Sequence, residues 1–508
     1  MASSTSRSKN STLNMSFSLL FQLITAISGL ILPKLIIENF GSDVNGLIAS
    51  ITQFLSYISL LEAGAEGVIR ASLYKPLSIG DKEKVSGIVV AAKKFYFRIA
   101  MIFLIYLAGM CIIYPLIVKT NFDFWYIVSM ILILSVGTIM QYLVGLYYST
   151  LITADQKSRI ISIVNIIAVI ANIAVTYALI LCGMSIHIVK IVSCLIFAGK
   201  PVFLMLYAKS HYQLNMKAAP DNNAIKQRWN GLVHHIAYFI HTNTDIALIT
   251  VFLNTKYVSV YSLYYAVVVG IEKIVTSISG GSAASFGNLI ATESKKYVND
   301  IFDKFEFIQI SVTTILFTIT GILIVPFMKV YTINITDVNY IYPEFAYIMV
   351  IAEALYCIRC IYSTVSLASG RYKQTQLFAI SEAIVNLAVS IVLIQYIGLI
   401  GIAIGTFLGM LTRTVLDMIY LSKNVLERSI FKFLKVLLVN ISISACAILI
   451  CGLAIPFSVT SWGGWIAYAV IVSVITALIA LTFYLIFYRE ILKSISKRYF
   501  GMNQKSKR

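Results

Sequence analysis

The sequence predicts an all-α polytopic membrane protein with about 14 transmembrane helices. Of its 508 residues, 59% are hydrophobic and only 12% are charged, and the mean hydropathy is +0.86. A soluble globular domain carries about 45–50% apolar and about 25% charged residues. The apolar excess is concentrated in segments that are each long enough to cross a bilayer of about 30 Å as a helix. This composition excludes a soluble enzyme.

Helices are expected in these segments because lipid offers backbone amide and carbonyl groups no hydrogen-bonding partner. A membrane β-barrel would instead show short segments of alternating hydrophobicity. We expect the first segment to be a retained span, since no small-residue cleavage site of a signal peptide stands out. The apolar segments are 12–38, 44–72, 96–118, 125–148, 159–181, 184–208, 231–253, 257–280, 305–329, 341–366, 376–396, 399–421, 433–455 and 464–488.

Lysine and arginine lie almost entirely on one side of these spans. If the N-terminus is cytoplasmic, the cytoplasmic segments hold 30 of them, and the external loops hold only Lys119, Lys256 and Lys329. Because cytoplasmic loops carry an excess of Lys and Arg, this distribution predicts that both termini are cytoplasmic. The formal charge of +18 is then explained by loops that face anionic lipid, and no nucleic-acid partner is expected.

A repeat relates the second span to the eighth with an offset of 214 residues. Each of these spans runs into a small-residue stretch, a charged cytoplasmic connector and a new apolar span; chance similarity between two apolar helices is the alternative. The repeat predicts two six-helix lobes related by a pseudo-twofold axis along the membrane normal. The predicted parts are an N-terminal lobe at 1–208, a cytoplasmic linker at 209–230, a C-terminal lobe at 231–421, and two additional spans with a basic cytoplasmic tail at 422–508.

Several charges fall inside the predicted spans, where each costs several kcal/mol unless it faces a cavity or a partner. In the segment 44–72, the i, i+4, i+8 spacing of Glu62, Glu66 and Arg70 predicts that all three lie on one helical face. Asp245 is the best candidate for a cation or proton site, because it is central in its span and follows the polar stretch HTNT. The remaining candidates for a cavity or for ion coupling are His241, Glu272 and the cations Lys34, Lys200 and Lys273.

For each of these charges, a purely structural ion pair is an equal alternative. The predicted spans 341–366 and 376–396 also carry Glu353, Arg359 and Glu382. In the span 399–421, Arg413 and Asp417 are spaced i, i+4, as an internal salt bridge would require.

Motifs of catalysis are missing from the sequence. There is no GxxxxGK[ST] phosphate loop, no HExxH and no GxSxG, and no external loop is long enough to hold the catalytic domain of a glycan polymerase. The seven cysteines are scattered, and the CxxC of Cys357 and Cys360 lies in an apolar helix, where small packing residues are the ordinary interpretation. We therefore expect no enzymatic activity, no metal and no cofactor, which leaves secondary transport or lipid flipping.

Two stretches indicate a family: FGSDVNGLIASITQFLSYISLLEAGAEGVIRASLYKPL (40–77) and NTDIALITVFLNTKYVSVYSLYYAVVVGIEKIV (243–275). Through them the chain resembles the Wzx-type polysaccharide and O-antigen flippases, which form the polysaccharide transporter branch of the multidrug/oligosaccharidyl-lipid/polysaccharide exporter superfamily. The resemblance covers nearly the whole chain in span order.

This resemblance implies a two-lobed inner-membrane protein that works by alternating access. It implies that undecaprenyl-diphosphate-linked oligosaccharide repeat units are moved across the membrane for O-antigen (lipopolysaccharide), capsule or exopolysaccharide synthesis. The implied partners are this lipid-linked glycan, membrane lipids, a polysaccharide polymerase and chain-length machinery. A diphosphate needs cationic partners in a low-dielectric site, which Lys34, Arg70, Lys200 and Lys273 would supply. The alternative is a cation-coupled multidrug or toxin exporter of the same superfamily, which an acidic site at Asp245 would favour.

Overall fold

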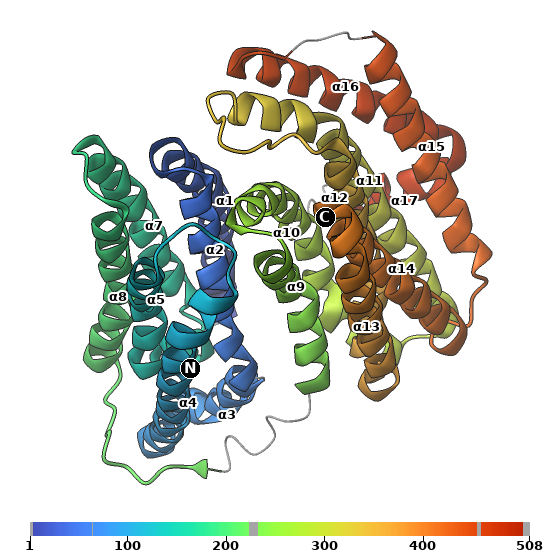
Figure 1. Cartoon of the computed structure of the whole chain (residues 1–508). Coiled ribbons are helices and arrows are strands. Elements are labelled where there is room, and N and C mark those ends of the chain that lie inside the picture. The colour runs from blue at the N-terminus through green and yellow to red at the C-terminus, as the bar shows by residue number, and fades with distance from the viewer. Residues whose placement is uncertain (1–3, 63, 223–231, 455–458, 501–508) are drawn as a thin grey trace. The chain divides into compact units, whose positions relative to one another are not determined.

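The computed structural model describes residues 4–62, 64–222, 232–454 and 459–500 of the chain (Figure 1). The side chains of residues 4–11, 232–238, 241, 242, 281, 284, 453, 454 and 495–500 are not described. Within the described ranges every regular element is a helix, which confirms the predicted all-α class.

Contacts divide the chain into two compact units, Met1–Leu263 and Tyr264–Arg508. The first unit contains α1 (Ser4–Phe40), α2 (Ser42–Ser56), η1 (Tyr57–Leu61), α3 (Ala65–Ile79), α4 (Lys82–Ile117), α5 (Phe124–Met140), η2 (Gln141–Gly145), α6 (Leu146–Ala154), α7 (Ser158–Leu181), α8 (Ile186–His211), α9 (Leu232–Phe252) and the start of α10 (Thr255–Thr292). The second unit contains the rest of α10, α11 (Lys295–Tyr331), α12 (Pro343–Ala368), α13 (Tyr372–Ile397), α14 (Leu399–Asn424), α15 (Phe431–Ala454), α16 (Trp462–Phe487) and α17 (Arg489–Phe500).

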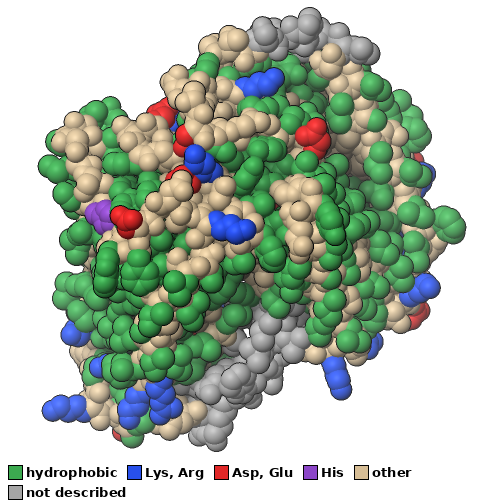
Figure 2. Space-filling view, in the orientation of Figure 1, with side chains coloured by type: hydrophobic (Ala, Val, Ile, Leu, Met, Phe, Trp, Pro, Cys, Tyr) green, Lys and Arg blue, Asp and Glu red, His purple; other side chains and the backbone are tan. Residues whose placement is uncertain are grey.

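The predicted spans reappear as helices in the predicted order. Thirteen helical segments of the described chain are long and apolar enough to cross a membrane, and the shorter apolar segment Asn243–Phe252 lies in α9, at the seventh predicted span. Figure 2 shows hydrophobic side chains over most of the visible face, as expected of a surface that faces lipid. Leu116 and Tyr396, for example, are 75% and 80% exposed.

Helices extend into two connectors that the sequence predicted as cytoplasmic links. Gly80 ends α3 with a φ of 75°, and the Asp81 carboxylate then accepts a hydrogen bond from the Lys84 amide at 2.9 Å, so that α4 begins at Lys82. The hydroxyl of Ser294 caps α11 in the same way by accepting from the amide of Tyr297. Such N-caps stabilise a helix by about 1 kcal/mol each. The basic residues of these connectors therefore extend from helix ends.

The described part of the predicted linker, residues 209–222, packs on the first unit. The amide of Asp221 donates to the carbonyl of Gly87 at 3.1 Å, and the Tyr212 hydroxyl donates to Asp155 Oδ2 at 2.7 Å. Burial and the hydrogen bond to Asp155 together raise the pKa of Tyr212. The contacts place the division between units inside α10, beyond this linker, and the predicted lobe boundary at 209–230 stays a prediction.

Glycines bring α13 and α14 into close contact in the second unit. A Cβ atom on Gly405 would lie 2.1 Å from Ser390 Oγ, and one on Gly401 would lie 2.5 Å from the carbonyl carbon of Leu393. Small residues at such four-residue spacing let two helices approach closely in lipid. This packing positions the buried charges of α12, α13 and α14 described below.

Candidate functional site

A line of polar side chains joins α2 to α9 and to the start of α10 within the first unit. Asn45 Nδ2 donates to Ser259 Oγ at 2.8 Å, and the Ser50 and Thr250 hydroxyls share a hydrogen bond of 2.6 Å. These four side chains are buried, where a polar group needs hydrogen-bonding partners within the protein. We call this line the polar seam; its members are Asn45, Ser50, Gln53, Tyr57, Asn243, Thr250 and Ser259.

The backbones of α2 and α10 touch at one end of the polar seam. A Cβ atom on Gly46 would lie 1.7 Å from the carbonyl oxygen of Thr255, so residue 46 has room only for glycine. Beside this contact the Thr255 hydroxyl donates to Asp43 Oδ1 at 2.7 Å, and Lys256 Nζ lies 3.8 Å from Asp43 Oδ2. The predicted topology puts these helix ends on the external side of the membrane.

One pair of the polar seam joins equivalent positions of the predicted repeat. Asn45 and Ser259 are 214 residues apart, which is the offset that relates the second span to the eighth. Residues related by a twofold axis contact each other only beside that axis. This contact is the one that the predicted pseudo-twofold axis would produce, and the axis stays a prediction.

Asp245 lies next to the polar seam, on α9. It is 5% exposed, and the Tyr261 hydroxyl of α10 donates to its Oδ2 at 2.8 Å. As a buried carboxylate with a hydroxyl donor beside a line of polar side chains, Asp245 stays the candidate for the cation or proton site that the sequence predicted. The side chain of His241, predicted beside it, lies outside the described part of the chain.

The segment 44–72 is not one helix. It divides into α2, the 3₁₀ turn η1 and α3, and Gly64 before α3 has a φ of 75°, a conformation that favours glycine. The prediction that Glu62, Glu66 and Arg70 share one helical face is therefore wrong for Glu62, which precedes this break. Glu66 and Arg70 remain on α3, with Oε1 and Nη1 4.0 Å apart.

Glu62 faces a second irregular helix. Its carboxylate lies beside the Tyr142 hydroxyl, which belongs to the π turn η2 between α5 and α6. A π turn within a helix is frequent at functional sites, and discontinuous helices form the ion sites of many transporters. Residue spacing gives no indication that the break before α3 lies beside the π turn η2. The glycine of LLEAGAE, Gly64, was a usable signal of the break.

The four predicted substrate cations lie on four helices: Lys34 on α1, Arg70 on α3, Lys200 on α8 and Lys273 on α10. Lys34 pairs with Glu38 at 3.2 Å, as Arg70 pairs with Glu66, so both have a carboxylate on their own helix. Neither Lys200 nor Lys273 forms an ion pair in the described chain. Lys273 is exposed, and Glu272 beside it is partly buried.

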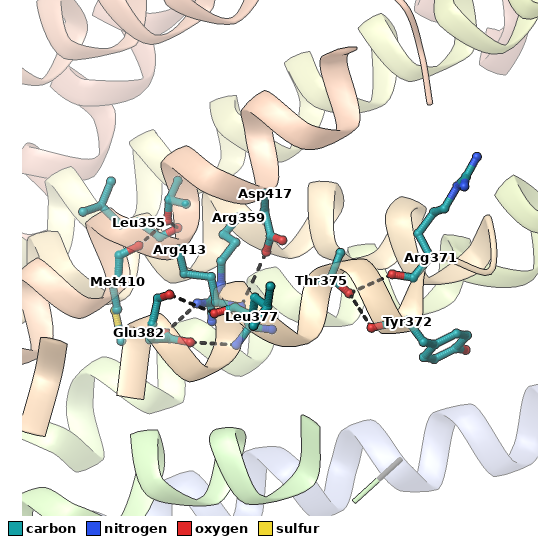
Figure 3. A network of polar contacts seen from close by, with 12 residues as sticks. Leu355, Arg359, Arg371, Tyr372, Thr375, Leu377, Glu382, Met410, Arg413 and Asp417 are labelled. Carbon is teal, nitrogen blue, oxygen red and sulfur yellow. Dashed lines mark hydrogen bonds and ion pairs between the residues drawn. The ribbon is translucent and has the colours of Figure 1, made fainter. Parts of the chain in front are cut away.

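Charges of α12, α13 and α14 form a buried network in the second unit (Figure 3). Glu382 accepts from Arg359 Nη1 at 2.5 Å and from Arg413 Nη1 at 2.7 Å, and Arg413 Nε lies 3.6 Å from Asp417 Oδ2. The sequence indicated only the Arg413–Asp417 pair, because the other partners come from separate helices. Each carboxylate oxygen of Glu382 thus accepts from a different arginine, and these contacts join α12, α13 and α14.

A second network fastens the connector between α14 and α15 to α11. Arg428 Nη1 donates to Asp303 Oδ1 at 2.7 Å and to Glu306 Oε2 at 2.8 Å, and its guanidinium lies 4.6 Å from the centroid of the Phe302 ring. Lys432 also donates to Asp303, at 2.6 Å. These residues do not stand out in the sequence, since they lie in a predicted connector and at the start of a span.

Solved structures share this arrangement of helices. The lipid II flippase MurJ, in an inward closed conformation, matches with a TM-score of 0.73 and 15% sequence identity, over 95% of this chain and 100% of that chain. An inward-facing multidrug resistance MATE family transporter of the MOP superfamily matches with a TM-score of 0.56 and 12% identity, over 82% and 98%. A MATE transporter of Vibrio cholerae has a TM-score of 0.57 at 11% identity, over 84% and 99%.

The chain has the fold of these transporters. Neither a protein-family model nor a curated protein matches its sequence. The structural likeness confirms the two-lobed fold class. It does not single out the Wzx branch.

Proposed function

We propose that this protein is a flippase for lipid-linked oligosaccharides in the cytoplasmic membrane, with both termini in the cytoplasm. It moves undecaprenyl-diphosphate-linked repeat units to the outer leaflet for surface polysaccharide synthesis, where a polymerase and chain-length machinery would use them. The observation that carries this proposal is the likeness in fold to a lipid II flippase over 95% of the chain. The MATE transporters named above match 82% and 84% of it with lower TM-scores.

The polar seam supports an alternating-access mechanism. Each of its neutral hydrogen bonds contributes about 0.5–1.5 kcal/mol net, so a few of them can hold α2 against α9 and α10 and still be released. On the predicted topology this contact closes the external side, and its release would open that side. A contact without ionised partners at Asn45–Ser259 and Ser50–Thr250 suits repeated opening better than a buried ion pair.

Unpaired cations favour an anionic substrate. Lys273 is exposed on α10 without an ion pair in the described chain, so its ammonium is available to a phosphate. In the first unit, Lys34 and Arg70 would each become available to an anion by leaving their carboxylate partners, Glu38 and Glu66. The alternative, a cation-coupled multidrug exporter, draws its support from Asp245 and its hydroxyl donor Tyr261.

Leaflet exchange tests the proposal directly. The purified protein is reconstituted in liposomes with a fluorescent polyprenyl-diphosphate oligosaccharide, and an impermeant quencher reports how much of this lipid changes leaflet with time. We expect protein-dependent exchange, slowed about tenfold by Lys273→Ala, because one charge-assisted phosphate contact is worth roughly 1.5–3 kcal/mol. Lys304→Ala, at the cytoplasmic end of α11, is the matched control and should exchange lipid at the wild-type rate.

The competing function has a distinct outcome. If several glycans fail to exchange while the same vesicles expel an organic cation when an ion gradient is imposed, the protein is an exporter and the flippase proposal is wrong. Asp245→Asn should then abolish the efflux, because an amide cannot carry the exchangeable proton or balance a bound cation.

A further inference from the structure

An apolar groove runs between α7 and α8 in the first unit. Its volume is about 410 Å³, and it is lined by Ile163, Ile167, Ala171, Ile196, Gly199 and Phe203 with the side chain of Lys200 among them. Ile167 and Phe203 are 62% and 51% exposed, so the groove is open along the surface of the unit. An exposed apolar groove on a membrane-spanning helix pair is complementary to hydrocarbon.

Lys200 lies near the middle of α8. Counting from Ile186 to His211, Lys200 is about 21 Å from one end of the helix and about 16 Å from the other. Its Nζ lies 4.8 Å from the centroid of the Phe197 ring, a cation–π contact, and it forms no ion pair in the described chain. A cation at this depth is costly without an anionic partner, which indicates that a ligand supplies one.

The depth of Lys200 selects the kind of lipid that can supply the anion. A phospholipid resting in either leaflet keeps its phosphate at the interface, about 15 Å from the centre of the hydrocarbon core. Its acyl chain would fill the groove, but its phosphate would meet the ammonium only with the lysine side chain fully extended toward the interface. A phosphate that crosses the membrane passes at the depth of Lys200 itself, and the lipid that crosses is the transported substrate.

We propose that the groove between α7 and α8 holds the hydrocarbon chain of the polyprenyl-diphosphate substrate, and that Lys200 contacts the diphosphate halfway through its crossing. This inference rests on the proposed flippase function. Tyr207 marks the end of the groove toward the end of α8, where its ring stacks on His211 at 3.9 Å. Aromatic side chains of this kind occur at the membrane interface, where the lipid would enter from the cytoplasmic leaflet.

Two substitutions test the role of the groove and the role of the Lys200 charge separately. A Cβ atom on Gly199 would meet no atom within 4 Å, so Gly199→Leu fills the groove without a clash at its Cβ. Lys200→Gln removes the charge and keeps most of the side-chain volume. Gly109→Leu on α4, where a Cβ also meets nothing within 4 Å, is the matched control for the first. Lys190→Gln, on α8 but outside the groove lining, is the control for the second.

The test combines photocrosslinking with leaflet exchange in liposomes. A polyprenyl-diphosphate oligosaccharide with a diazirine in its chain is crosslinked to the full-length protein, and labelled peptides are mapped. We expect labelling of 160–171 and 196–207, reduced about tenfold by Gly199→Leu, and leaflet exchange slowed about tenfold by Lys200→Gln. Both controls should behave as wild type.

Several outcomes would overturn the inference and leave the flippase intact. One is labelling that maps away from α7 and α8 while the wild type still exchanges the lipid. Another is equal labelling of the groove by a diazirine phospholipid together with unchanged exchange by Lys200→Gln, which would make it a site for bulk lipid. If the wild type exchanges no polyprenyl-diphosphate lipid at all, the inference and the proposed function both fail.

Discussion

Glu382 lies between two arginine guanidinium groups in the interior of the second unit and is 0% exposed. Taking these charges out of water costs several kcal/mol per ion, and their mutual attraction offsets that cost only while the geometry is kept. The glycines of α14 allow this geometry, since they bring α13 and α14 close enough for Glu382 to reach Arg413. Charge and packing therefore depend on each other here.

Removing this one charge should destabilise the protein strongly. Glu382→Gln leaves Arg359 and Arg413 buried with a neutral neighbour, and breaking a buried ion pair typically costs about 3–5 kcal/mol. Thermal unfolding in detergent should show a lower midpoint than wild type. Glu344→Gln, at the exposed start of α12, removes a carboxylate without a buried partner and should leave the midpoint unchanged. Equal midpoints for Glu382→Gln and wild type would contradict the structural role of the network.

The sequence predicted local charge pairs better than distant ones. The i, i+4 spacing of Arg413 and Asp417 and of Glu66 and Arg70 indicated pairs that the structure contains. Arg359 and Glu382 lie on different helices, and no periodicity within one helix connects them. Partners across helices depend on which faces pack together, and a single sequence does not contain that information.

At the scale of the element, α2 is the helix whose contacts the proposed mechanism requires to open. Its polar face is bonded to α9 and α10, and Gly46 lets the backbones of α2 and α10 touch. If this contact must open in each transport cycle, then a covalent bond across it should stop the cycle. The hydrogen-bonded pair of Asn45 and Ser259 is the position at which to place that bond.

Cysteines at both positions should lock the polar seam. In a variant whose seven native cysteines are replaced, Asn45→Cys with Ser259→Cys should form a disulfide on oxidation, and leaflet exchange should fall to the protein-free background. A reductant should restore exchange, because it removes only the crosslink. Asn45→Cys alone is the control and should be insensitive to oxidant. If the fully crosslinked protein exchanged lipid as fast as the same protein after treatment with reductant, the seam would not open during transport.

Helix positions followed from the sequence more closely than helix interruptions. Apolar length predicted fourteen spans, because a bilayer requires that length, and thirteen segments of the described chain are helices long enough to cross one. The break between η1 and α3 was missed, since hydrophobic spacing continues across the 3₁₀ turn and across Gly64, whose φ is positive. The π turn at Gln141–Gly145 has no spacing signature that distinguishes it from an α-helix.

At the scale of the whole molecule, the fold and the direction of insertion into the membrane are predicted from different features of the sequence. The fold follows from apolar length and is shared with transporters that have only 11–15% of their residues in common with this chain. The direction of insertion follows instead from where the 40 lysines and arginines lie. A rearranged charge pattern would invert the protein in the membrane and leave its helices unchanged. The side on which the polar seam closes is therefore a prediction from charge alone.

Single cysteines on opposite predicted faces test that direction. Thr336→Cys lies in the loop between α11 and α12, which the charge pattern places outside, and Ser78→Cys lies at the exposed end of α3, which it places inside. In intact cells of the cysteine-free variant, an impermeant maleimide should label Thr336→Cys and should reach Ser78→Cys only after permeabilisation. Lys217→Cys, in the connector after α8, should likewise be labelled only after permeabilisation, because six predicted spans separate it from the cytoplasmic N-terminus. The reverse labelling pattern would place the polar seam on the cytoplasmic side, so the structure would then hold the protein closed toward the leaflet from which its substrate must enter.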